Sequence, residues 1–162
     1  MNKRTLFAVV LAGFVVAACG TFGTPGSGGG GHGRPPPQPC NGNICRLDVP
    51  VTVVTFIGHE QVVIGPVPDL VMAKGNHGLE GKGVSILWHL KNSRYMFKDD
   101  GIAFYSDSSA SQFSGKGTGG DGAEFHWIDA NTDSNSYGYQ IKIYDRQSGT
   151  WATLDPTIIN QK

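Results

Sequence analysis

Oxygen-bearing side chains alternate along one short segment near the C-terminus. Asp129, Asn131 and Asp133 occupy every second position there. Alternate carboxylate and amide oxygens at this spacing can wrap around Ca²⁺. The segment lacks the turn glycine and the distal bidentate glutamate that calcium-binding loops use, because Ser134 and Gln140 stand at those places. The alternative is a polar hairpin loop whose Asp and Asn side chains cap its own backbone.

Histidines form a second group with metal-ligating chemistry. Imidazole suits zinc and copper, and the chain carries His59, His77, His89 and His126. His89 and His126 fall on the outward positions of two expected strands, so they could be neighbours across a sheet. The alternative is that both are ordinary surface residues. A Zn²⁺ or Cu²⁺ site at this pair is therefore a hypothesis.

The first residues resemble the signal of bacterial lipoproteins. Lys3 and Arg4 precede an apolar run, Leu6 to Ala18, which is too short to span a bilayer and ends in Val-Ala-Ala-Cys19. This ending resembles a lipobox. The resemblance implies removal of the signal peptide, residues 1–18, and a lipid anchor of palmitate-type acyl chains on Cys19. Gly20 is not the aspartate that retains such lipoproteins at the inner membrane, which implies the periplasmic face of the outer membrane.

Cys40 and Cys45 remain outside the lipid site. An exported protein meets an oxidising compartment, and the intervening Asn41-Gly42 is a tight-turn dipeptide. We therefore expect a disulfide that staples the tether to the first strand. A redox role would favour two residues between the cysteines, and here there are four.

No catalytic constellation can be assembled from the sequence. The chain has many serines but no Gly-x-Ser-x-Gly elbow, and Asp99 and Asp100 diverge on an extended chain. The segment Gly115–Gly120 satisfies Gly-x-Gly-x-x-Gly, but it leads into a strand rather than a helix, so we expect a flexible loop. We expect no enzyme; a hydrolase whose residues the sequence does not reveal is the alternative.

Composition divides the chain into three parts. After residues 1–18, residues 19–39 are rich in glycine and proline and are expected to be a disordered tether. Residues 40–162 suit one domain with one core. Without Lys3 and Arg4, 11 basic residues stand against 13 acidic ones, a formal charge of −2, which argues against nucleic acid as a partner.

Period-two alternation predicts an all-β domain. Leu47, Val49, Val51 and Val53 alternate with polar residues and predict an edge strand over 46–53, because Pro50 lacks a ladder donor. Further strands are expected at 61–64, 70–73, 84–90, 102–105, 125–129, 137–144 and 151–154. The expected core positions are Val84, Ile86, Trp88 and Leu90 in one strand and Tyr137, Tyr139, Ile141 and Ile143 in another. About seven to eight strands in this pattern predict an antiparallel β-sandwich.

Several later segments resemble cupredoxin-like domains, and more loosely immunoglobulin-like ones. They are Val-Ser-Ile-Leu-Trp-His-Leu from Val84, Tyr-Met-Phe from Tyr95, Phe-His-Trp-Ile-Asp from Phe125 and Tyr-Gly-Tyr-Gln-Ile-Lys-Ile from Tyr137. The end of the chain is similar to that of small uncharacterised bacterial envelope proteins. Tyr95 stands where a blue-copper member has its first histidine, and Ile141 or Ile143 where it has its cysteine, so the resemblance implies no type 1 copper.

These features together predict a lipid-anchored envelope protein that is a non-catalytic binding or structural module. Its expected partners are the membrane, through the anchor, and an unknown protein or small molecule. The alternative is a metal-binding periplasmic lipoprotein. No cofactor is expected, apart from Ca²⁺ in that alternative.

Overall fold

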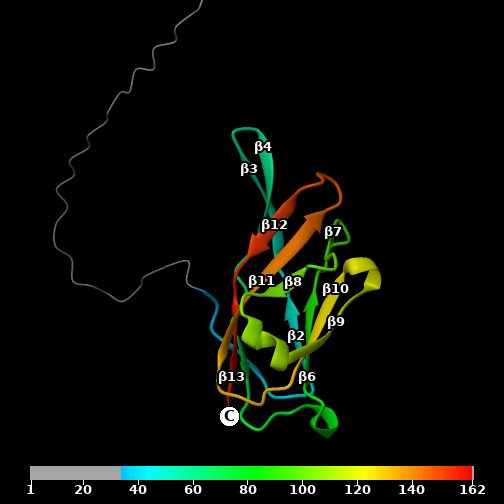
Figure 1. Ribbon diagram of the computed structural model, residues 1–162. Coiled ribbons are helices and arrows are strands. Elements are labelled where there is room, and N and C mark those ends of the chain that lie inside the picture. The colour runs from blue at the N-terminus through cyan, green and yellow to red at the C-terminus, as the bar shows by residue number, and fades with distance from the viewer. Residues whose placement is uncertain (1–33, 162) are drawn as a thin grey trace, which may run out of the picture. The chain divides into compact units, whose positions relative to one another are not determined.

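The structure, a computed structural model, describes residues 34–161, and these are predominantly β (Figure 1). Three short 3₁₀ turns, η1 (Leu79–Gly81), η2 (Asp107–Ser111) and η3 (Gly120–Gly122), are the only helical elements of this range. The strands are β1 (Gln38–Cys40), β2 (Ile44–Asp48), β3 (Val51–Phe56), β4 (His59–Ile64), β5 (Leu70–Met72), β6 (Val84–His89), β7 (Tyr95–Met96), β8 (Ile102–Phe104), β9 (Phe113–Gly119), β10 (Glu124–Asp129), β11 (Ser136–Asp145), β12 (Trp151–Leu154) and β13 (Thr157–Asn160).

Two larger sheets and one hairpin make up the fold. The first sheet has the order β1-β5-β13-β11-β12, with β7 and β8 also paired to β11, and the second has the order β2-β6-β10-β9. Strands β3 and β4 form a two-stranded sheet of their own. The pairs β1–β5, β5–β13 and β2–β6 are parallel. The larger sheets are therefore mixed rather than wholly antiparallel as the sequence pattern predicts.

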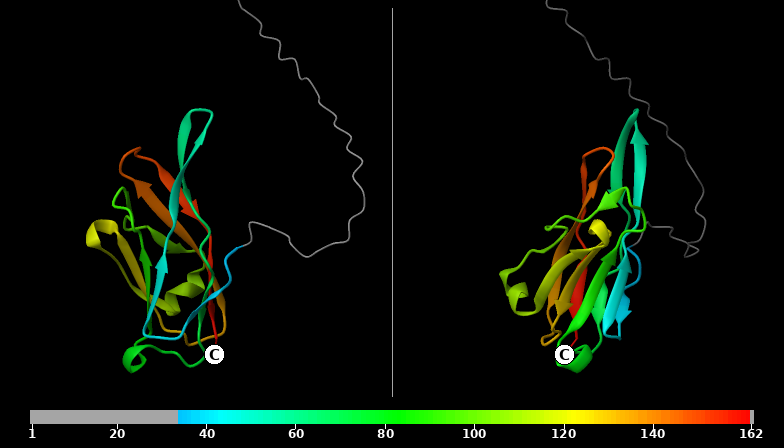
Figure 2. Two further views of the ribbon diagram at one scale, coloured as in Figure 1. Left: turned by 180° about the vertical axis from the view of Figure 1, so that it is seen from behind. Right: turned by 90° about the vertical axis from the view of Figure 1, so that its right-hand side faces the viewer.

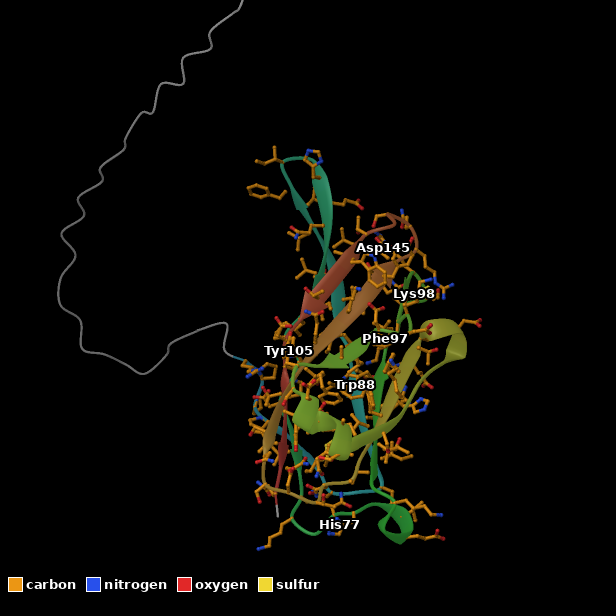
Figure 3. All side chains as sticks on the ribbon, viewed as in Figure 1. His77, Trp88, Phe97, Lys98, Tyr105 and Asp145 are labelled. Carbon is orange, nitrogen blue, oxygen red and sulfur yellow. A yellow bond between two sulfur atoms is a disulfide. The ribbon has the colours of Figure 1, made fainter. Side chains whose placement is uncertain are left out.

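The two larger sheets share one core, which gives the domain a sandwich-like organisation (Figure 2). The expected core positions of β6 and β11 are confirmed, since all eight side chains are buried. Trp88 of β6 contacts Tyr139 of β11 edge to face at 5.4 Å and donates a hydrogen bond to its hydroxyl at 3.2 Å. This pair joins the two sheets and gives the buried indole N–H a partner. Trp88 lies near the middle of the domain (Figure 3).

Two expectations about local structure are corrected. The strand predicted over 46–53 is divided, because β2 ends at Asp48 and β3 begins at Val51 in a different sheet. Pro50, which has no N–H to continue a ladder, lies at the break. The expected Gly-rich loop is largely strand β9, paired with β10. Glycine is needed there, since a Cβ on Gly117 would lie 2.6 Å from the His126 ring.

The expected disulfide between Cys40 and Cys45 is present. It connects β1 of the first sheet to β2 of the second, and both cysteines are buried. Strand β1 includes Gln38 and Pro39, which the composition assigns to the tether. Cys19 and residues 1–33 lie outside the described residues.

The double variant Cys40→Ser/Cys45→Ser is expected to lose about 2 kcal/mol of unfolding free energy, because the broken ring is short and its closure entropy is small. Urea denaturation of both proteins measures the difference. Adding reductant to the wild type should reproduce the loss, and leave the double variant unchanged. Equal stability of the double variant and the oxidised wild type would contradict a stabilising role for the disulfide.

Candidate functional site

The hairpin β3–β4 projects beyond the other elements, at the end of the domain opposite the C-terminus (Figure 1; Figure 2). Its register pairs Val51 with Ile64 at the base and Phe56 with His59 at the tip. Side chains directly opposite each other in an antiparallel pair share a face. The inward face carries Val62 and Ile64, which are buried, and β4 contacts β12.

The outward face of the hairpin carries exposed apolar side chains, interspersed with Thr52, His59 and Gln61. It carries Val54, Phe56 and Val63, and Ile57 follows at the turn; we call these four residues the tip patch. Phe56 is 70% exposed, Ile57 80% and Val54 48%. Four of the eight exposed large hydrophobic side chains of the described chain therefore lie on this one hairpin. Such a concentration is typical of interaction surfaces, whereas single exposed apolar residues are ordinary.

The turn that closes the hairpin is strained. Ile57 has φ 49° and Gly58 has φ 77°, so both central residues have the positive φ that a type I′ turn requires. Glycine adopts this conformation freely, but a β-branched residue there is an outlier that costs about 1–2 kcal/mol. The exposed isoleucine gains no core packing in return. Strain at an exposed position is a feature of functional sites.

The hairpin is nearly free of charge. Glu60 is the only acidic residue of segment 51–64, which has no lysine or arginine. Glu60 Oε2 lies 3.8 Å from Arg94 Nη2 on the body of the domain. The tip patch therefore offers apolar contact and free backbone edges, and no basic residue that would attract an anionic surface.

A second candidate site is a polar cluster at the C-terminal end of β10. Asp129 ends that strand, Asn131 follows in the loop, and Asn160 ends β13. Asp129 Oδ1 accepts hydrogen bonds from the Asn131 backbone N–H at 2.8 Å and from Asn160 Nδ2 at 3.2 Å. Asn131 Nδ2 donates to the carbonyls of Ala73 and Asn76. The cluster thus joins three segments that are distant in the sequence.

Asp133 lies beside this cluster with its carboxylate already engaged. Its oxygens accept hydrogen bonds from the Tyr137 hydroxyl at 2.5 Å, from the backbone and side chain of Asn135, and from Asn160 Nδ2 at 3.4 Å. Burial raises the pKa of Asp133, but these hydrogen bonds outweigh it and hold the pKa below its usual value. The structure therefore brings Asp129, Asn131 and Asp133 together, and it adds Asn160.

Burial raises the pKa of Asp129 to about 6, although hydrogen bonds from Asn131 and Asn160 act in the opposite direction. The nearby charge of Asp133 adds to the increase. Asp129 is thus a buried carboxyl group for which the charged form is costly.

The histidines lie in two places. His89 and His126 occupy the same face of the β6–β10 pair, on diagonal positions, because Glu124 is opposite His89 and Leu87 is opposite His126. His89 Nδ1 lies 3.1 Å from Asp48 Oδ1, and Lys91 also pairs with Asp48. His59 is at the hairpin, while His77 lies at the opposite end of the domain (Figure 3). Among residues 34–161, no three His, Cys, Asp or Glu side chains form a group that could hold a metal ion.

Asp48 and Asp100 lie in different surroundings. A cavity of about 350 Å³ adjoins Asp48, and no serine or histidine lines it. Asp100 pairs with Lys142 at 2.5 Å rather than with Asp99. Tyr95, Ile141 and Ile143 are buried in the core.

The comparisons with known proteins assign no family. No protein-family profile matches the chain. A search of curated proteins also finds no match. Within residues 34–161, no helix is long and apolar enough to cross a membrane.

Sequence reasoning missed the tip patch and Asn160. Phe56-Ile57-Gly58-His59 lacks the Asn-Gly or Asp-Gly pair that marks a two-residue turn, so the hairpin had no local signal. Asn160 lies 31 residues after Asp129 and meets it through the pairing of β13 with β11. Only the register of these strands, and no sequence motif, places Asn160 beside Asp129.

Proposed function

We propose that the protein is a lipid-anchored envelope protein, held through Cys19 on the periplasmic face of the outer membrane, and that its β domain is a non-catalytic binding module. The tip patch of hairpin β3–β4 is the contact surface. The finer fold assignment, a cupredoxin-like or immunoglobulin-like sandwich, belongs to the same proposal and rests on the resemblance of residues 84–160.

The single observation that carries the binding role is the strained, exposed Ile57 at the end of an apolar hairpin. Folding alone would favour asparagine or glycine at this turn. It would also favour polar residues at Val54 and Phe56, which are 48% and 70% exposed. An apolar partner surface accounts for both features, because burial of a large aliphatic or aromatic side chain contributes about 1.5–3 kcal/mol.

The occupant that fits this surface is a partner protein with an apolar pocket or an exposed strand edge. Phe56 of the tip patch is an aromatic anchor of the kind that is enriched in protein interfaces. The hairpin has no lysine or arginine, so it lacks the basic residues that draw a surface element to anionic lipid. The lipid at Cys19 already supplies membrane attachment in this proposal, so the hairpin is free for a protein contact.

Ile57→Asn tests stability and binding separately. The variant creates an Asn-Gly type I′ turn and should gain about 1 kcal/mol of unfolding free energy in urea denaturation, because asparagine tolerates positive φ. In pull-downs from native envelopes it should recover at least tenfold less partner than the wild type.

Leu79→Asn is the matched control, since Leu79 is also exposed and lies outside the hairpin. It should capture as much partner as the wild type. Equal capture by Ile57→Asn and the wild type would contradict the proposed surface. A loss of stability in Ile57→Asn would contradict the strain argument.

A further inference from the structure

Three buried side-chain oxygens in the polar cluster have no hydrogen-bond partner. They are Asp129 Oδ2, Asn131 Oδ1 and Asn160 Oδ1. Their residues are 0%, 1% and 2% exposed. Buried polar atoms are nearly always paired, and an orphaned group costs about 1–3 kcal/mol. Three such atoms in one cluster indicate an occupant that satisfies them.

The three residues are held together through one carboxylate oxygen. Asp129 Oδ1 accepts from the backbone N–H of Asn131 and from the side-chain amide of Asn160, so both residues are one hydrogen bond away from the same carboxylate. Asn131 Nδ2 and Asn160 Nδ2 are committed to other acceptors. The amide orientations are thereby fixed, and each leaves an oxygen free.

The unpartnered atoms of the cluster are all acceptors, and its carboxylates have no cationic partner among the described residues. The three free atoms are all oxygens, and Asp133 adds a second carboxylate next to Asn160. Among the described residues, neither Asp129 nor Asp133 forms a salt bridge with lysine, arginine or histidine. A water molecule can donate only two hydrogen bonds, so one water leaves an oxygen unsatisfied.

We propose that Asp129, Asn131 and Asn160 form a buried calcium site, with the three unpartnered oxygens as its side-chain ligands. Carboxylate and amide oxygens are hard ligands of the kind that Ca²⁺ takes, in irregular sets of about six to eight. Mg²⁺ demands near-ideal octahedral geometry, whereas Ca²⁺ accepts irregular sets of oxygen ligands such as this one. Zinc prefers nitrogen and sulfur ligands, and this set has neither.

Asp133 is a positioning residue in this site. Its oxygens are occupied by Tyr137, Asn135 and Asn160, so it orients the Asn160 amide instead of using a free oxygen on the ion. The ion joins the end of β10, the end of β13 and, through Asn131, the loop at Ala73–Asn76. It therefore stabilises the end of the domain away from the hairpin, and it is independent of the proposed binding surface.

The test uses the full protein after treatment with chelator. Addition of Ca²⁺ at ten times its dissociation constant should raise the melting temperature by about 5 °C. Asp129→Asn keeps an acceptor for Asn131 and Asn160 but removes the charge, and it should melt at the same temperature with and without Ca²⁺. Asp107→Asn, which removes an exposed carboxylate elsewhere, should respond as the wild type does.

Terbium provides a second readout that does not depend on stability. Tyr137 lies next to the site through Asp133 and should sensitise Tb³⁺ luminescence, which Ca²⁺ should displace and which Asp129→Asn should lack. The proposal is overturned if chelator-treated wild type shows neither a calcium-dependent shift nor Tb³⁺ luminescence. It is also overturned if Asp129→Asn responds as strongly as Asp107→Asn.

Discussion

Replacing Asp145 with alanine is expected to lower the free energy of unfolding by about 3 kcal/mol at neutral pH, because it removes a buried carboxylate that accepts four hydrogen bonds. Asp145 ends β11 and is fully buried. Arg94 holds it with two hydrogen bonds, Nε to Oδ1 at 2.8 Å and Nη2 to Oδ2 at 2.6 Å. The Gln147 backbone N–H and the Ser148 hydroxyl complete its shell. Figure 3 shows Asp145 at the hairpin end of the domain.

Acid should remove this stabilisation. Hydrogen bonds from Arg94, then Ser148 and Gln147, hold the pKa of Asp145 well below its usual 3.8 despite burial. A carboxyl whose pKa is lowered on folding stabilises the protein above its unfolded pKa and loses that contribution as the pH falls below it. The difference between wild type and Asp145→Ala should therefore be constant from pH 7 to pH 5 and shrink below pH 4, about where the unfolded carboxyl titrates.

Asp100→Ala is the matched control for the ion pair. Asp100 pairs with Lys142, which lies on β11 as Asp145 does, but the Asp100 carboxylate is more than half exposed. Exposed pairs contribute about 0–1 kcal/mol, so this variant should stay close to the wild type in urea denaturation. Equal losses for the two variants would contradict the role assigned to burial at Asp145.

Replacing Cys19 with alanine is expected to release the protein from the membrane fraction, because two or three acyl chains supply the proposed attachment. The wild type should fractionate with the membrane and accumulate as a precursor in the presence of globomycin. The variant should be soluble or remain unprocessed. Cys40→Ser/Cys45→Ser is the control, since it removes cysteines without touching the signal. A soluble wild type with no globomycin-sensitive precursor would refute the anchor.

The sequence predicted the interior of the fold better than its connections. Alternation in β6 and β11 correctly gave their buried residues, because one face of each strand packs on the other sheet. The same alternation ran through Pro50 without a change of period, so it concealed the switch from β2 to β3. Strand β9 was missed because its Ser-Gly-Lys-Gly-Thr-Gly run has little β propensity, and the ring of His126 takes the space that a side chain would fill.

The candidate sites show the same limit. The Asp129 series was visible because its oxygen-bearing residues occupy every second position of one short segment, but Asn160 joins it only through sheet pairing. The tip patch was hidden for a different reason. Val54, Phe56 and Val63 have the composition of core residues, and only the projection of the hairpin leaves them exposed.

Site-specific photocrosslinking at position 56 is the most direct test of the proposed binding surface. In one variant, a photoreactive phenylalanine analogue replaces Phe56 in cells. In a control variant, the same analogue replaces Lys74, an exposed residue in the loop next to His77, at the other end of the domain. Irradiation of native envelopes should give one discrete adduct with another protein from position 56 and none from position 74. The same adducts from both positions, only a dimer of this chain, only lipid adducts, or no adduct from position 56 would contradict a partner protein at the hairpin.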